Sequence, residues 1–166
     1  MSVFKTTFSR ALRIYPSDDA NIPFPIVIES GTTTNSGPSQ LIDANALFVT
    51  NGVKTGDIVI SNSNSLMVTV VEVIDENTLL LNANVFSLGY EYVVYQASSQ
   101  SGLGNQGCYL YIGDAPGEGG GAVTVTTIGG DIVTFNGIFR GTILPVQVIK
   151  LHTAETVDVN KINALW

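Results

Sequence analysis

His152 and Cys108 carry the side chains of this sequence that most readily do chemistry, and each is the only residue of its type. A catalytic histidine needs a nucleophile and an orienting acid beside it. Neither a G-x-S-x-G elbow nor a cysteine-nucleophile signature accompanies His152. One cysteine forms no disulfide within the chain, and one cysteine with one histidine cannot make a Cys/His zinc site. We therefore interpret His152 as a surface or packed structural residue and Cys108 as a small buried apolar one.

Paired carboxylates and a glycine-rich run are the other patterns that could bind a ligand. Acids lie close in sequence at positions 18 and 19, 75 and 76, and 114 and 118, without the spacing of a calcium loop. The run GDAPGEGGG at 113–121 resembles a phosphate loop, but the alternating strand AVTVTT follows it where a helix is needed. We therefore predict no catalytic residue, no metal site and no cofactor.

Composition and charge exclude some partners and favour others. With 7 basic and 14 acidic residues, the 166-residue chain has a formal charge of −7, which argues against a nucleic-acid groove. Only 13% of its residues are charged, against a usual fraction of about 25%. The opening residues lack the apolar core of a leader peptide, and no apolar run is long enough to cross a membrane. We expect a soluble, unexported protein that meets other proteins through uncharged surfaces.

Short runs that alternate apolar and polar residues, cut by Gly, Pro, Asn and Asp, predict an all-β chain. AVTVTT, Gly129-Gly130 and DIVTF together predict a hairpin with a two-residue turn. Residues 75–77 separate a second pair of strands. Helical spacing occurs only at 43–49, where Asp43 is placed to cap one or two turns. The predicted strands are 10–15, 57–61, 66–74, 78–81, 91–95, 109–112, 122–127, 131–135, 146–152 and 161–165.

Two linker-like stretches, PSDDANIPFP and ASSQSGLGNQG, set off an acidic middle from a nearly neutral remainder. Residues 26–97 contain one base and seven acids, giving −6, which leaves −1 for the rest of the chain. The N-terminal piece has one good strand, so it must pair with a distant segment. We predict a discontinuous β-sandwich or barrel core from residues 1–25 and 105–166, with 26–97 inserted as a small acidic β-barrel module and 98–104 as a linker.

The chain ends on Trp166, directly after an apolar strand, although chain ends usually fray and are polar. A tryptophan in this place indicates that the end is tied down, in the core or against a neighbouring subunit. With Leu165 and the apolar run Leu144, Pro145 and Val146, it forms our predicted assembly interface.

Several segments together carry a family resemblance. They are CYLYIG, the hairpin AVTVTTIGGDIVTF, GTILPVQVIKL and the closing NALW. A further segment, IYPSDDANIP, is similar to one that, in the family named next, leads directly into a strand. Tyr111, Ile112 and Gly113 match that strand here. This combination, over about half of the chain, resembles the head spike base family of phage and gene-transfer-agent virion proteins.

The resemblance implies a structural role without catalysis. Copies of the chain would attach to the capsid or its vertices as a head decoration or spike base that can support a fibre. It implies self-association as a pentamer or trimer and contacts with the major capsid protein or other virion proteins. It also implies a place on the virion after assembly in the host cytoplasm. Nucleic acid and membrane are not expected partners.

Two other assignments stay open. The middle, with LIDANALFVTNGVKTGDIVISNS and YEYVVYQ, resembles a small SH3-like β-barrel seen inside many phage structural proteins. A neck, tail or baseplate component is therefore the alternative. A carbohydrate-binding module is the other, because Tyr109 and Tyr111 share one face of their predicted strand.

Overall fold

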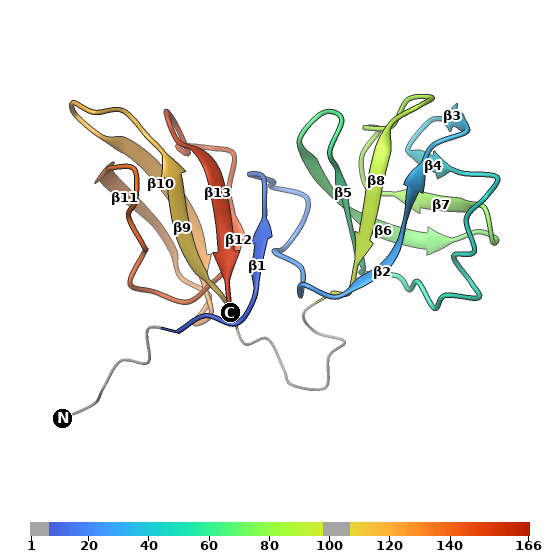
Figure 1. The fold of residues 1–166 in the computed structure, drawn as a ribbon, viewed down its shortest axis with the longest axis horizontal. Helices are drawn as coiled ribbons and strands as arrows, with labels where there is room; N and C mark the ends of the chain where they lie inside the picture. Colours follow the sequence, from blue (N-terminus) through green and yellow to red (C-terminus); the bar gives the residue numbers. More distant parts are fainter. Residues whose placement is uncertain (1–6, 98–106) are drawn as a thin grey trace.

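The computed structural model describes residues 7–97 and 107–166, and the regular structure in these ranges is β-strand (Figure 1). The predicted all-β class is confirmed, and the sheets are open and stacked as in a sandwich. The strands are β1 (Ala11–Arg13), β2 (Val27–Thr32), β3 (Asn35–Gly37), β4 (Gln40–Ile42), β5 (Ile58–Ser61), β6 (Leu66–Val73), β7 (Thr78–Leu81), β8 (Glu91–Tyr95), β9 (Tyr109–Asp114), β10 (Gly121–Thr127), β11 (Ile132–Ile138), β12 (Val148–Leu151) and β13 (Asn160–Leu165).

A three-stranded sheet, in the order β1-β13-β9, joins the two ends of the chain (Figure 1). β13 runs antiparallel to both neighbours, with Leu12 opposite Ala164 and Leu165 opposite Tyr109. Alternation along β13 places Ile162 and Ala164 in the buried core. The opening strand therefore finds its partner in the last strand of the chain.

A second three-stranded sheet has the order β11-β10-β12. We call these two three-stranded sheets together the core lobe. Val123, Val125 and Val148 of this sheet share one buried apolar cluster with Leu110 and Ile112 of β9. Valine and isoleucine suit such half-buried strands because their branched side chains pack well on a pleated surface.

The hairpin between β10 and β11 is confirmed, but its turn is longer than predicted. Thr127 N–H donates to Asp131 C=O at 2.8 Å, so three residues form the loop. Gly130 takes the left-handed φ of 94° that a three-residue hairpin loop requires at its last position.

The middle of the chain forms a seven-stranded antiparallel sheet in the order β2-β8-β5-β6-β7-β4-β3. The predicted hairpin around residues 75–77 is confirmed by the pairing of β6 with β7. The sheet has an apolar cluster of its own, in which the rings of Phe48 and Phe86 lie 6.0 and 6.4 Å from that of Tyr92. Its likeness to an SH3-like barrel stays a prediction.

The prediction of a short helix at residues 43–49 is wrong. The segment runs through consecutive turns, in which Ala46 N–H donates to Asp43 C=O at 3.1 Å. Asp43 does close the first turn, because its Oδ1 accepts from Asn45 N–H at 3.0 Å. Its Oδ2 accepts from the hydroxyl of Tyr92 at 2.8 Å. Phe48 N–H donates to Glu76 C=O and Val49 N–H donates to Glu76 Oε2, both at 3.0 Å, so tertiary partners take N–H groups that a helix would bond internally.

The core lobe and the middle sheet are joined by packing and hydrogen bonds. Ile58, Ile60 and Met67 of the middle sheet belong to the apolar cluster of the core. Ser17 Oγ–H donates to Met67 C=O at 2.9 Å, and the carbonyl of Asp19 accepts from side chains of the middle sheet. The segment at 17–19 therefore bridges the two lobes.

The two chain crossings between the lobes lie side by side, because Phe24 N–H donates to Gln96 C=O at 2.9 Å. The division into a discontinuous core and an inserted segment 26–97 stays a prediction. The linker predicted at 98–104 lies outside the described residues.

At Gly120, in the glycine-rich connection between β9 and β10, both the backbone angle and the neighbouring atoms require glycine. Gly120 has a φ of +66°, and a Cβ there would lie 2.5 Å from the carbonyl carbon of Gly137. Nothing lies within 4 Å of a Cβ built on Gly117. Backbone packing thus explains Gly120 in the run that resembles a phosphate loop.

We expect Gly120→Ala to lower the free energy of unfolding by about 2–3 kcal/mol, through its left-handed φ and the collision with Gly137. Gly117→Ala is the matched control, with an expected change below about 0.5 kcal/mol. Urea denaturation followed by circular dichroism measures both. Equal effects of the two substitutions would show that the contact with Gly137 does not matter.

Candidate assembly site

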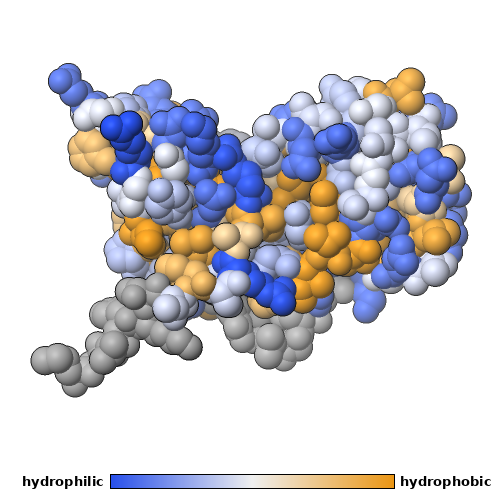
Figure 2. Space-filling view, in the orientation of Figure 1, coloured by the Kyte–Doolittle hydropathy of each residue, from blue (hydrophilic) through white to orange (hydrophobic). Residues whose placement is uncertain are grey.

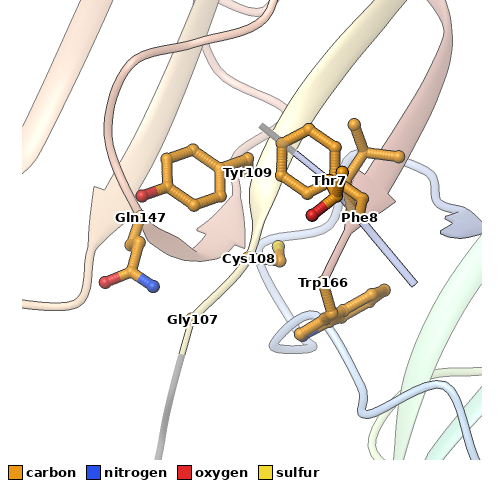
Figure 3. Close-up of a pocket in the computed structure, with 8 residues that line it drawn as sticks. Thr7, Phe8, Gly107, Cys108, Tyr109, Gln147 and Trp166 are labelled. Carbon is orange, nitrogen blue, oxygen red and sulfur yellow. The ribbon is translucent and has the colours of Figure 1, made fainter. Parts of the chain in front are cut away.

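The two ends of the chain meet at one end of the core lobe around a pocket of about 230 Å³ (Figure 3). The pocket is lined by Thr7, Phe8, Gly107, Cys108, Tyr109, Gln147, Leu165 and Trp166. We call these residues, with the neighbouring Pro145 and Val146, the terminal patch. The rings of Phe8 and Tyr109 lie 5.7 Å apart, and Leu165 and Trp166 line the same pocket.

Main-chain hydrogen bonds hold Trp166 in place. Its carbonyl oxygen accepts from Ser9 N–H at 2.6 Å and Arg10 N–H at 3.2 Å, and its own N–H donates to Arg10 C=O at 3.0 Å. The indole ring lies 6.2 Å from the ring of Phe24 and is partly exposed. The terminal tryptophan is therefore anchored by its backbone while part of its ring stays accessible.

Four of the five predicted assembly residues have accessible side chains in this patch. Pro145 is exposed, and Val146, Leu165 and Trp166 are partly buried. Leu144 is only 1% exposed and packs in the core cluster, where its N–H donates to Leu110 C=O at 2.9 Å. We therefore correct the prediction for Leu144, because its side chain is enclosed within the protomer.

The patch extends to the tip of the β10–β11 hairpin. Ile128 N–H donates to Gln147 C=O at 2.9 Å, and the Ile128 side chain is 45% exposed. Figure 2 shows apolar residues on the visible face of the core lobe and along its junction with the middle sheet. Exposed apolar area of this kind is typical of surfaces that other proteins cover.

Cys108 contributes little reactivity to the pocket that it lines. The residue is 2% exposed, its Sγ–H donates to Val148 C=O at 3.6 Å, and burial strongly raises the pKa of its thiol. Since the thiolate is the reactive form, Cys108 packs as the small apolar residue that the sequence predicts.

A relay of three side chains lies beside β10 and β12. Thr126 Oγ1 is 2.7 Å from His152 Nε2, and His152 Nδ1 is 3.2 Å from Asp18 Oδ1. Thr153 holds the Asp18 carboxylate with its N–H and its hydroxyl. Hydroxyl, imidazole and carboxylate thus follow the order of a catalytic triad.

The surroundings of the relay favour a structural role. Hydrolysis through a hydroxyl nucleophile also needs donors aimed at an oxyanion. Thr126 lies in the central strand β10, opposite Ile132 on one side and Lys150 on the other, so its main chain belongs to the sheet. Lys150 Nζ donates to Asp18 C=O at 2.9 Å. Together these contacts clasp the bridging segment at 17–19 onto β12.

This clasp gives the stability of the protein a dependence on pH. Hydrogen bonds, first from the Thr153 hydroxyl and then from Thr153 N–H and His152, lower the pKa of Asp18 below 3.8 despite slight desolvation. Between the lowered pKa and 3.8 the unfolded chain binds more protons than the folded one. The stabilisation by Asp18 is therefore full above 3.8 and is lost as the pH falls through the lowered pKa.

We expect Asp18→Asn to remove this part of the acid dependence. The thermal unfolding midpoints of the unchanged chain and of the variant, measured from about pH 5 to about pH 2, should converge at the acid end of this range. Parallel curves over that range would contradict a stabilising role for the ionised Asp18.

Within residues 7–97 and 107–166, no group of three or more His, Cys, Asp or Glu side chains could hold a metal ion. The described part of the chain contains no helix long and apolar enough to cross a membrane. Comparisons of the chain with protein-family models, with curated proteins and with solved structures found no match.

Proposed function

We propose that this protein is a non-enzymatic structural component of a virion, either a head decoration or the base of a vertex spike. The observation that carries the proposal is the terminal patch, where an anchored and partly exposed Trp166 closes the sheet that joins both chain ends. Aromatic residues of this kind, set in a pocket on a rigid sheet, are typical anchors of protein interfaces. The resemblance of CYLYIG, GTILPVQVIKL and NALW to head spike base proteins supports the proposal that this interface is used in a virion.

In this proposal the partners are proteins. Copies of the chain form a closed homo-oligomer, a pentamer or a trimer, through the terminal patch. The assembly attaches to the major capsid protein or another virion protein and can support a fibre, with the acidic middle sheet directed outward. Its location is the virion, after assembly in the host cytoplasm. The charge of −7 supports the absence of nucleic acid from the partners.

A neck, tail or baseplate component is the second candidate, supported by the middle sheet with its own apolar cluster. We propose that this sheet is the SH3-like module that its sequence resembles. A carbohydrate-binding module is the third candidate, supported by the rings of Phe8, Tyr109 and Trp166 around the terminal pocket.

Native mass spectrometry of the purified protein separates an assembly protein from a sugar-binding module. We expect a defined homo-oligomer that Trp166→Ala weakens at least tenfold, about the effect of removing an interface anchor. Leu88→Ala is the matched control, because Leu88 is a 67% exposed apolar residue of the middle sheet lobe. A monomer that binds glycans would favour the sugar module instead. Hydrolase activity that His152→Ala abolishes would contradict the non-enzymatic role.

A further inference from the structure

β11 is an edge strand whose outer side pairs with no other strand among the described residues. It lies on the side of the core lobe opposite the middle sheet, at the far left of Figure 1. With seven residues it is longer than the edge strands β1 and β3, which have three each. The edge strand β2 has six residues but carries the charge of Glu29. β9 and β12 are edge strands too, but main-chain bonds from other segments cover part of each, since Ile112 N–H donates to Thr142 C=O and Ile22 N–H donates to Ile149 C=O. β11 is therefore the most open of the six edges.

The sequence of β11, IVTFNGI, lacks two of the features by which proteins protect an open edge. It contains neither a charged residue nor a proline, the two commonest obstacles to pairing with another chain. Ile132 is 67% exposed, and Phe139, directly after the strand, is 48% exposed. An edge without charge or proline, flanked by exposed apolar side chains, is suited to strand addition.

A bulge near the end of β11 determines which residues share a face. Ala122 of β10 lies opposite Asn136 and Gly121 lies opposite Ile138, so Gly137 has no partner. Gly137 has a φ of 68°, as expected for a glycine in a bulge. Beyond the bulge the alternation is shifted by one residue, because Phe135 and Ile138 both pack against the core although their numbers differ in parity.

We propose that a second copy of this chain pairs with β11 along this edge, antiparallel and about a twofold axis that passes beside Phe135. A twofold axis perpendicular to the sheet continues the same sheet face from one copy into the other. Residues opposite each other across the contact must therefore lie on the same face. With Gly137 set aside as the bulge, the register that places Phe135 opposite its own copy also places Ile132 opposite Phe139. Both of these side chains are exposed in the single chain.

The same register makes the charges at the two ends of the edge complementary. Asp131 directly precedes β11 and Arg140 lies two residues after it, and both are exposed. Arg140 lies in the turn that follows Phe139, where Thr142 N–H donates to Phe139 C=O at 3.2 Å. In the paired strands Asp131 of each copy therefore faces the turn that carries Arg140 in the other, and the symmetry produces this approach twice. Opposite charges across paired strands stabilise them, whereas like charges destabilise them. The edge is thus complementary to itself in charge as well as in apolar contacts.

This contact is independent of the proposed function and of the terminal patch. A twofold contact alone cannot close a ring of three or five copies. It therefore joins two chains or two rings, while the terminal patch makes the ring. Loss of one contact would leave the other in place, so the two proposals fail separately.

Disulfide trapping tests the register. The substitutions Ile132→Cys and Phe139→Cys are made in separate proteins, which are then mixed under mild oxidation. We expect a covalent dimer from the mixture and little from either protein alone, because each new cysteine faces the other position of the second copy. The unchanged chain, with its buried Cys108, gives the background. Equal trapping in the mixture and in the separate samples, or none in any, would overturn the register.

Charge exchange tests the contact without a covalent bond. Sedimentation equilibrium of the Trp166→Ala variant, in which the ring contact is weakened, should show a dimer from micromolar to millimolar concentration, and the substitutions below are made in that background. Asp131→Arg and Arg140→Asp should each raise its dissociation constant about tenfold. The double variant should restore the dimer. Glu118→Arg, which changes net charge as much at an exposed loop residue, is the control and should have little effect. A dimer that is not restored in the double variant, or a dissociation constant raised as much by Glu118→Arg, would overturn the proposal.

Discussion

Removal of residues 162–166 is expected to abolish cooperative unfolding of the core lobe. β13 lies between β1 and β9, so its loss leaves both neighbours without their partner. It also takes Ile162 and Ala164 out of the buried cluster. Burial of one isoleucine contributes about 1.5–3 kcal/mol, and the total stability of a domain is about 5–15 kcal/mol. Near-ultraviolet circular dichroism and calorimetry measure the outcome.

Trp166→Ala is the matched control for this truncation. It keeps the main-chain bonds between residue 166 and Arg10 and removes only the indole ring. We expect a stable, cooperatively unfolding protein that has lost about 1–2 kcal/mol of stability and most of its self-association. A truncated chain that still unfolds cooperatively with the midpoint of the full chain would contradict the central place of β13.

Tyr92→Phe is expected to lower the free energy of unfolding by about 2 kcal/mol, although it removes a single oxygen atom. The Tyr92 hydroxyl donates to Asp43 Oδ2 at 2.8 Å, and both side chains are buried, with 1% and 4% exposure. The substitution keeps the packing of the ring against Phe48 and Phe86. The loss therefore comes from a buried carboxylate that has lost a donor. Urea denaturation measures it.

The same substitution at Tyr111 provides the comparison. Tyr111 is a partly buried tyrosine of β9, so Tyr111→Phe should change stability by less than about 0.5 kcal/mol. Similar losses at both positions would show that hydroxyl removal is costly in general and that the bond to Asp43 has no special weight.

Alternation of apolar and polar residues was enough to predict the all-β class and both hairpins. It failed at residues 43–49, where the N–H groups of Phe48 and Val49 bond to Glu76 in a distant part of the chain. The length of the β10–β11 loop was also missed, because only the bond from Thr127 to Asp131 shows that three residues form it. Contacts of this kind depend on the folded geometry and leave no periodic signal.

The candidate site was only partly visible in the sequence. The unusual terminal Trp166 pointed to the patch, and Leu165 was predicted with it because the two residues are adjacent. Leu144 was misplaced because a short apolar run does not reveal which of its residues faces inward. Phe8 carried no signal at all, since its position beside Tyr109 depends on the pairing of the chain ends.

Contacts between lobes were likewise beyond the sequence. Asp18 and His152 are far apart in the chain and meet only because the segment at 17–19 crosses beside β12. Met67 belongs to a strand of the middle sheet but packs in the core cluster. Charge counts separate the middle from the rest of the chain, yet they say nothing about this shared packing.

Electron microscopy of virions that carry a gold label on this chain tests the proposed function most directly. A tag between Gly117 and Glu118, in an exposed connection with open space around it, should not disturb the core. We predict gold on the particle heads, at the vertices or spread over the capsid, and a label on the neck or tail would support the second candidate. Tagged protein that is folded and abundant in the producing cells but absent from every particle would contradict a structural role in the virion.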